Sequence, residues 1–428
     1  MPEEPGPAPE ESGGKRVSWV ELYFDLIFAF AVGQTAHIMV ADPHWGGLGR
    51  AFGLFVPLWW TWIGFVVLYN RHGEDHISQR LLLLVGTLPC AVAAVETHSA
   101  ARGDLLAFTF ALAGARLVLA AAFAFTAEGA RPVSIGYGFS TAAFAASAFV
   151  PSPWRYLIWA FALLQEAGFL LLRGNGEPSG DRNRARSRDR NGARSRERGA
   201  ERPPRPSRTE QVASVFKPPA DPSRRVDAGH LAERFGGMII ILLGEVVASV
   251  SASAVDLPDH NLRYWAGLLA GLVLAAALWW IYFTAAAPMS ESVLSASGGN
   301  PNLAYGLYAG GHLPPAFALL GMSAGVSLVL SGDSPQAAAW FVTGGLAVYL
   351  VGTRVVLTSR LTRFEPQLRW AVAGATACLA FLAPLISAAG VVLVTAAWAA
   401  AVAAYETWRA PGRLKDILAD PLTFFRRA

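Results

Sequence analysis

The chain has 428 residues, of which 53 % are hydrophobic and 15 % are charged, and its net charge is +4. In soluble domains about a quarter of the residues are charged, so this composition excludes an ordinary soluble enzyme. The charges cluster between apolar runs of roughly 18 to 24 residues, which is the length that a helix needs to cross a bilayer. We therefore expect an all-α integral membrane protein.

Twelve apolar runs predict about twelve transmembrane helices, six on each side of a long polar stretch. They lie at 20–40, 51–69, 81–97, 105–126, 133–150 and 154–172, and then at 235–254, 264–286, 303–330, 337–358, 369–388 and 390–406. The last two runs touch at Ala389 and Gly390, where we expect a hairpin. The N-terminus is acidic and rich in Pro and Gly, unlike a secretory signal, so the first helix should act as an uncleaved insertion signal.

These runs divide the chain into five predicted parts. They are a disordered N-terminus at 1–17, a first six-helix repeat at 18–173, a linker at 174–229, a second six-helix repeat at 230–408 and a C-terminal tail at 409–428. The linker is rich in Arg, Pro and Gly, so it cannot bury enough surface to fold. We expect a solvated cytoplasmic linker, with contact to anionic lipid headgroups as the alternative and no nucleic-acid partner.

The positions of Lys and Arg predict the orientation in the membrane. If the N-terminus is cytoplasmic, most basic residues fall in cytoplasmic loops and tails, even without the linker. The opposite side then receives only Arg50, Arg102, Arg155 and Arg263. This bias follows the positive-inside rule and predicts that both termini are cytoplasmic.

The two halves of the chain resemble each other in sequence. L-W-W-T-W at 58–62 matches L-W-W-I-Y at 278–282, and G-A-R-L-V-L at 114–119 matches G-T-R-V-V-L at 352–357. The sixth run of each half carries a segment that begins with W-A and ends at an acid, W-A-F-A-L-L-Q-E at 159–166 and W-A-A-A-V-A-A-Y-E at 398–406, so that the acids are Glu166 and Glu406. Because six spans is an even number, we expect the halves to be parallel repeats.

Ionisable residues in the first run are candidates for function, because a charge at the bilayer centre costs on the order of 3 kcal/mol. Glu21 and Asp25 are four residues apart and share one helical face. His37 lies further along the same helix. Asp25 is either part of a transport path or paired structurally with an arginine, and both interpretations stay open.

The seventh run places His230, Glu233 and Arg234 at the cytoplasmic rim and Glu245 near the middle of the membrane. The rim group lacks the second histidine of a zinc-protease motif. Glu245 is the most costly acid in the chain, and it is our first candidate for an ion, proton or substrate path. The alternative is a purely structural ion pair.

Arg116 and Arg354 each lie in the middle of a fourth run and need a carboxylate or water nearby. We expect them to pair with Asp25 and Glu245, one arginine for each half. Arg234 is a further charge partner. Glu166 and Glu406 are predicted to be structural residues exposed at the cytoplasmic ends of their helices.

The stretch G-G-H-L-P-P at 310–315 is predicted to break the ninth run. His312 in this break could relay a proton or bind a cation, or it could be a satisfied histidine at a kink. The two cysteines, Cys90 and Cys378, lie inside apolar runs and are expected to serve in packing. Neither a metal site nor a cofactor is predicted.

Two motifs resemble a known family. E-L-Y-F-D-L-I-F at 21–28 is similar to the pattern that opens the first span of the bacterial low temperature requirement A family, and H-L-A-E-R-F-G-G-M-I-I-I-L-L-G-E at 230–245 is similar to a second motif of that family. The resemblance implies a multi-pass protein of the bacterial inner membrane in which the motif acids matter. The biochemical activity of the family is not established, so the resemblance assigns no catalytic residue.

Four functions remain open at this point. The first is a transporter that couples the movement of a solute or ion to buried acids. A dimeric cation channel is the second, supported by a remote similarity of the F-D pair to a motif of lysosomal-type potassium channels. A membrane scaffold or sensor is the third. An intramembrane enzyme is the least expected, because the sequence contains no nucleophile or metal motif.

Overall fold

The computed structural model describes residues 17–72, 76–126, 131–172, 218–219, 222–255, 262–332, 335–358 and 365–419. Within these residues all regular secondary structure is helical, as the long apolar runs predict. The predicted linker lies almost wholly outside the described residues, as do most of the N-terminal segment and the last residues of the chain. The linker's predicted disorder and lipid contact therefore stay predictions.

The first half of the chain forms six α-helices that coincide with the first six apolar runs. They are α1 (Trp19–Ala41), α2 (Trp45–His72), α3 (Ile77–Ala101), α4 (Leu106–Thr126), α5 (Arg131–Ser147) and α6 (Trp154–Leu172).

The second half is less regular, although its helices again follow the apolar runs. It contains η2 (Pro222–Arg224), α9 (Ala228–Val255), α10 (Leu262–Ile281), the π-helical η3 (Tyr282–Ala286), α11 (Ala287–Ala296), α12 (Pro301–Ala304), the π-helical η4 (Tyr305–Gly310), α13 (Leu313–Ser331), α14 (Pro335–Thr358), α15 (Glu365–Cys378), the 3-10 helix η5 (Leu379–Leu382) and α16 (Ala383–Ala419). The break predicted around 310–315 coincides with the end of η4 and the start of α13. The helix of α16 passes the predicted end of the second repeat at 408.

The predicted hairpin at Ala389 and Gly390 lies close to a real irregularity. The backbone leaves the helical region at Ser387, which has φ 67° and ψ 161°. Both α15 and α16 pack against α14. The chain therefore bends two residues before the point at which the apolar runs touch.

Eight helical segments in the described residues are long and apolar enough to cross a membrane. They are Trp19–Ala41, Trp45–Arg71, Ile77–Ala101, Leu106–Phe125, Trp265–Ala296, Pro301–Ser331, Gln336–Thr353 and Trp370–Trp408. The protein is thus a multi-pass helical membrane protein.

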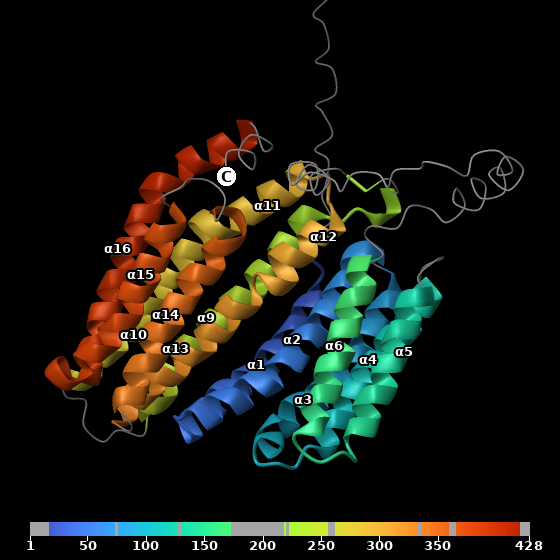
Figure 1. Ribbon diagram of the computed structural model, residues 1–428, viewed down its shortest axis with the longest axis horizontal. Coiled ribbons are helices and arrows are strands. Elements are labelled where there is room, and N and C mark those ends of the chain that lie inside the picture. The colour runs from blue at the N-terminus through green and yellow to red at the C-terminus, as the bar shows by residue number, and fades with distance from the viewer. Residues whose placement is uncertain are drawn as a thin grey trace, which may run out of the picture.

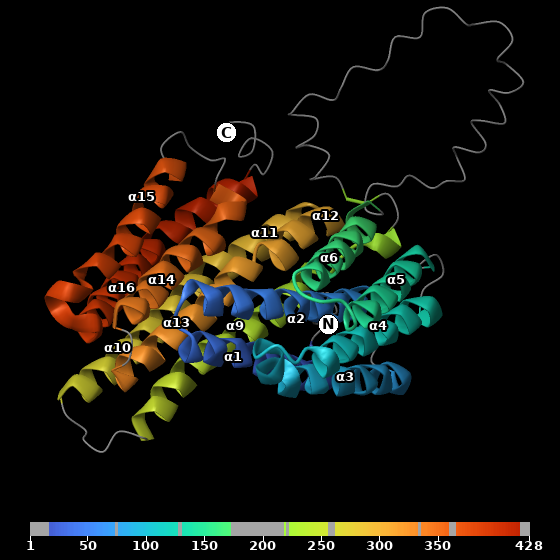
Figure 2. The same cartoon turned by 60° about the horizontal axis from the view of Figure 1, so that its bottom comes forward.

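The helices of each half pack mainly against one another, and α1 and α2 lie at the boundary between the halves. Figures 1 and 2 show α1 and α2 beside the yellow to red helices of the second half, with α3 to α6 on their other side. Both α1 and α2 pack against α9 and α13. The indole of Trp59 in α2 also donates a hydrogen bond to the carbonyl of Ala309 in η4, at 3.0 Å.

Glycines permit close contact between α13 and α14 in the second half. A Cβ added at Gly345 would lie 2.6 Å from Met322, and one added at Gly325 would lie 2.7 Å from Val342. Small residues at such crossings let backbones approach within a membrane, where packing drives association. This tight pair gives α9 a fixed neighbour, because α9 also packs against α13.

Candidate functional site

Four ionisable side chains from α1 and α9 meet in the interior, close to the first turns of both helices. We call them the α1–α9 cluster, and its members are Glu21, Asp25, His230 and Arg234. Each of them is at most 1 % exposed. In both helices the two cluster residues are four positions apart, so each helix presents its pair on one face.

Arg234 lies between the two carboxylates of α1 and bonds to both. Its Nε and Nη2 donate to Oδ2 and Oδ1 of Asp25, at 2.8 and 2.6 Å. Its Nη1 donates to Oε1 of Glu21, at 2.6 Å. The two parallel bonds to Asp25 form the bidentate geometry that makes arginine–carboxylate pairs strong and directional. One arginine therefore fixes the position of α1 against α9.

Glu21 also helps to begin α1. Its Oε2 accepts hydrogen bonds from both the backbone N–H and the hydroxyl of Ser18, each at 2.9 Å. Ser18 directly precedes α1, and a glutamate three residues after such a serine is typical of a capping box. The start of α1 and its contact with α9 thus depend on the same side chain.

Asp25 has a third donor from α2. The indole N–H of Trp62 donates to Oδ1 of Asp25, at 2.7 Å. Trp62 is fully buried, and its ring meets the ring of Phe235 in α9 edge-on, with centroids 4.8 Å apart. The cluster therefore connects three helices.

Asn70 at the end of α2 specifies the protonation of His230. The backbone N–H of Asp227 donates to Oδ1 of Asn70 at 3.1 Å, which identifies Nδ2 as the donor end of the amide. Nδ2 lies 2.9 Å from the carbonyl of Asp227 and 3.2 Å from Nδ1 of His230. Nδ1 therefore accepts, and Nε2 carries the proton that it donates to Oε1 of Glu21 at 3.0 Å.

Among the described residues, the Glu21 carboxylate thus accepts hydrogen bonds from Ser18, His230 and Arg234. The Asp25 carboxylate accepts them from Trp62 and Arg234. Removing one partner from a buried ion pair costs about 3–5 kcal/mol, because it leaves an uncompensated charge. The predicted pairing of Asp25 with Arg116 or Arg354 is wrong, since Asp25 pairs with Arg234. Arg234 and Asp25 are 209 positions apart, so the spacing within either helix does not by itself show that they meet.

Arg116 instead pairs with an acid of its own half. Its Nε donates to Oε1 of Glu166 in α6 at 2.8 Å, and its Nη1 donates to the hydroxyl of Thr61 in α2 at 2.9 Å. The guanidinium carbon lies 3.9 Å from the ring centroid of Phe144 in α5, a cation–π contact. Glu166 is only 2 % exposed, so its predicted exposure at the interface is wrong.

The matching residues of the second half are described only in part. Arg354 belongs to α14, but its side chain lies outside the described residues. Glu406 in α16 is 2 % exposed, so it too is buried rather than exposed at the end of its helix. The predicted partner of Arg354 therefore stays untested.

Glu245 has surroundings of a different kind. Among the described residues, its carboxylate has no hydrogen-bond donor and no cationic partner. A Cβ added at Gly33 in α1 would lie 3.2 Å from Oε2 of Glu245, so the carboxylate lies directly against α1. Gly33 is eight residues beyond Asp25, which places Glu245 about 12 Å deeper along α1 than the cluster.

The Glu245 carboxylate lines a cavity of about 470 Å³ between α1, α3 and α9. Its other walls are apolar and comprise Leu26, Ile27, Ala29, Phe30, Ala91, Ala94, Val95 and Ile241. A volume of this size lies within the range of small-molecule sites, about 300–1,000 Å³. We call this space the Glu245 cavity.

His312 is buried between the two π-helical segments. Its Nδ1 lies 2.9 Å from the carbonyl of Leu307, and its Nε2 lies 2.9 Å from the hydroxyl of Tyr282 in η3. The ring of Tyr308 in η4 stacks on it, with an interplanar angle of 5°. Both ring nitrogens are satisfied, so this geometry favours a structural histidine, although π-helical turns often mark functional sites.

The remaining predicted path residues lie at the surface. His37 is on the exposed side of α1, and Glu233 is exposed at the start of α9. Oε2 of Glu233 accepts a hydrogen bond from the backbone N–H of Val17, at 3.1 Å. Neither residue joins the α1–α9 cluster or lines the Glu245 cavity.

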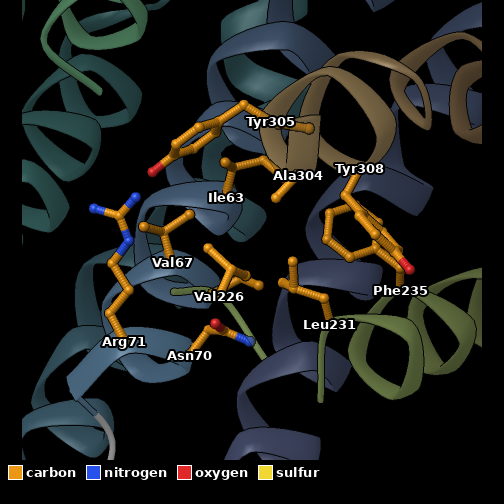
Figure 3. A pocket seen from close by; sticks show the side chains of 12 residues that line it. Ile63, Val67, Asn70, Arg71, Val226, Leu231, Phe235, Ala304, Tyr305 and Tyr308 are labelled. Atoms are coloured by element: carbon orange, nitrogen blue, oxygen red, sulfur yellow. The ribbon is translucent and has the colours of Figure 1, made fainter. Parts of the chain in front are cut away.

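A smaller cavity of about 20 Å³, enough for one water molecule, lies beside the cluster. Figure 3 shows its lining, in which the guanidinium of Arg71 and the hydroxyl of Tyr305 lie close together. The guanidinium carbon of Arg71 is 5.9 Å from the ring centroid of Tyr305. Asn70 belongs to this lining as well, so the cavity borders the residue that orients His230.

Sequence reasoning missed Trp62, Asn70 and Asp227, which complete the cluster. Only Asp227 carried a local signal, because it precedes α9 and its Oδ1 accepts the backbone N–H of His230 at 3.0 Å, as an N-terminal capping residue does. The indole of Trp62 and the amide of Asn70 gain their roles only from the packing of α2 against α9.

Comparisons with known proteins agree with this description. The model of the bacterial low temperature requirement A protein family (LtrA) matches residues 16–404. The chain is also similar to an uncharacterized protein of Rhizobium meliloti (strain 1021), with 22 % identity over 317 residues, which covers 71 % of this chain and 67 % of that protein. This chain therefore belongs to the bacterial low temperature requirement A family.

Proposed function

We propose that this protein is a transporter in which Glu245 binds and releases a cation or proton during the movement of a solute or ion. The observation that carries the proposal is the contrast between the acids of α1 and Glu245. Glu21 and Asp25 are held by Arg234, whereas Glu245 has no partner among the described residues and faces a cavity. An ionisable group inside a membrane is costly, and its retention without a structural partner indicates function.

A dimeric cation channel is the less favoured alternative. A pore built on the acids of α1 would need their carboxylates to face a water-filled path. Arg234 bonds to both carboxylates, and both acids are 1 % exposed. The arrangement of these acids supports a structural role for them, and no catalytic step forms part of the proposal.

The proposal includes twelve membrane spans in two parallel six-helix repeats, with both termini in the cytoplasm of a bacterial inner membrane. The order of helix contacts supports the repeats. In the first half α1 packs against α2 and α3, and α4 packs against α3 and α5. In the second half α9 packs against α10 and α13, and α14 packs against α13 and α15. The basic residues of the loops support the orientation.

Ion flux in proteoliposomes tests this function. Wild-type protein is reconstituted, a potassium, sodium or proton gradient is imposed, and internal pH and membrane potential are followed with dyes. We expect flux above that of empty liposomes, and we expect Glu245→Gln to abolish it because the amide cannot take up a proton or neutralise a cation.

Glu96→Gln is the matched control. It makes the same chemical change at a partly buried acid of α3 that does not line the Glu245 cavity, and it should leave flux unchanged. Wild-type flux in Glu245→Gln would overturn the role of Glu245. Absence of flux from folded wild-type protein under every gradient would overturn ion-coupled transport and favour the scaffold or sensor. Potential-driven flux without proton movement would favour the channel.

A further inference from the structure

The walls of the Glu245 cavity suggest what kind of molecule enters it. We propose that the cavity is a binding site for a lipophilic organic cation, a molecule with an apolar body and one delocalised positive charge, that enters from the bilayer. This inference rests on the proposed transport function only in naming its substrate class, because binding at the site can be measured without transport.

Charge is the first argument. The cavity contains one carboxylate and no basic side chain, since its other lining residues are aliphatic or aromatic. No cation from the described residues neutralises this carboxylate. In an environment of low dielectric constant a monovalent cation is its natural partner, whereas an anion would be repelled and a neutral molecule would leave the charge unpaired.

The donor set excludes a divalent or transition-metal ion as the preferred occupant. Calcium requires about six to eight oxygen ligands and magnesium about six. Transition metals favour imidazole or thiolate ligands. In the described part of the chain no three His, Cys, Asp or Glu side chains are grouped to hold a metal ion. One carboxylate in an apolar wall suits a cation that needs no coordination shell.

Phe30 adds a second feature that an organic cation would use. Its ring lines the cavity together with Leu26 and Ile27 on the same helix. An aromatic face attracts quaternary or delocalised cations, and the attraction increases where water is excluded. The aliphatic wall of α3 supplies contact for the apolar body of the ligand.

The position of the cavity indicates the route of entry. Leu26 and Phe30 are each 56 % exposed and Val95 is 69 % exposed, although all three lie in helices long and apolar enough to span a membrane. These side chains therefore face the region that acyl chains occupy. A lipophilic cation dissolved in the bilayer can reach Glu245 from the side, between α1 and α3.

The test measures the binding of radiolabelled tetraphenylphosphonium to the full-length protein in lipid nanodiscs, with empty nanodiscs subtracted. Tetraphenylborate, which has nearly the same shape and the opposite charge, is the matched probe. We expect Glu245→Gln to weaken tetraphenylphosphonium binding at least about tenfold. Tetraphenylborate should not bind wild type more tightly than the variant. Ala91→Trp, which fills the cavity from α3, should also weaken tetraphenylphosphonium binding.

Unchanged tetraphenylphosphonium affinity in both Glu245→Gln and Ala91→Trp, with each variant shown to be folded by its melting temperature, would overturn the proposal. A second copy of the chain is the competing occupant. If a second copy covers the cavity, Val95→Cys in a Cys378→Ala background should form a disulfide between two chains in the membrane. Efficient formation of this disulfide-linked dimer would also overturn the proposal.

The outcomes separate this proposal from the transport function. Flux that depends on Glu245, without tetraphenylphosphonium binding, would retain the transporter and remove this substrate class. Binding that depends on Glu245, without any flux, would retain the site and remove the transporter.

Discussion

The α1–α9 cluster and Glu245 contain the same chemical group in opposite circumstances. In the cluster, each carboxylate accepts several hydrogen bonds and shares one arginine. About 12 Å further along α1, the carboxylate of Glu245 has no such partner in the described residues and borders a cavity. The two sites therefore differ in the supply of hydrogen-bond donors and cations to their carboxylates, and under the proposed function this supply separates the structural acids from the functional one.

The largest expected effect comes from removing the shared partner in the cluster. Arg234→Gln should destabilise the protein by about 3–5 kcal/mol, because it leaves Glu21 and Asp25 buried without a cation. Thermal unfolding in detergent measures the loss. Glu233→Gln changes the adjacent, exposed residue and should melt close to wild type. Equal melting temperatures for Arg234→Gln and wild type would show that the cluster does not stabilise the fold.

The Arg116–Glu166 pair tests whether a buried pair within one half behaves in the same way. Arg116→Gln should cost somewhat less than Arg234→Gln, because it strands one carboxylate rather than two. The double variant with Glu166→Gln should be less destabilised than the sum of the single variants, with a coupling of about 0.5–3 kcal/mol. Strict additivity in this thermodynamic cycle would contradict the pairing.

Trp62→Phe removes one donor from Asp25 and keeps most of the aromatic packing. We expect a loss of about 1.5–3 kcal/mol, the usual value for a hydrogen bond to a charged group. Trp60 offers a matched control, since its indole nitrogen is buried without a hydrogen-bond partner among the described residues. Trp60→Phe should therefore cost less. A larger loss for Trp60→Phe would indicate that packing, not the hydrogen bond, dominates.

Glu245→Gln should stabilise the protein, whereas the substitutions in the buried pairs destabilise it. Replacing an unpaired carboxylate in an apolar wall with a neutral amide should raise stability, by on the order of 1 kcal/mol. Thermal unfolding beside Glu96→Gln measures the change. A clear decrease in the melting temperature would mean that Glu245 has a stabilising partner and belongs with the cluster acids.

The smallest effect is expected outside the membrane spans, at Asp42. Its carboxylate contacts His44 at 2.9 Å and Arg50 at 2.5 Å, and these contacts hold the pKa of Asp42 below its usual value. Because the pKa of Asp42 is lower in the folded than in the unfolded state, the ionised carboxylate stabilises the fold at pH values above its unfolded-state pKa. This stabilisation is lost as the pH falls through the folded-state pKa. Because the group is exposed, water and salt screen the contacts. Asp42→Asn should leave the melting temperature at neutral pH within experimental error.

The helices were predictable because long apolar runs have one stable form in a membrane. The shared faces of Glu21 with Asp25 and of His230 with Arg234 also follow from spacing alone. The two spacings are equal and their charges complementary, so the sequence contained a signal for the cluster that the predicted pairing overlooked.

The partners themselves depend on helix packing, which the sequence does not show. Arg116 could have met any acid near its depth, and the structure selects Glu166 because α4, α5 and α6 pack in series. Likewise, the sequence predicts a membrane position for Glu245, but only the gap between α1, α3 and α9 reveals the cavity.

The boundary between the halves is held by side chains of α1, α2 and α9 and by the indole of Trp59 on the carbonyl of Ala309. These contacts do not require a continuous peptide between Leu172 and Pro218. Two polypeptides produced separately, one ending and the other beginning between these residues, would carry matching surfaces. We expect them to reassemble in one membrane into a complex that retains the bonds from Arg234 to Glu21 and Asp25. The protein could then be produced as two separate polypeptides.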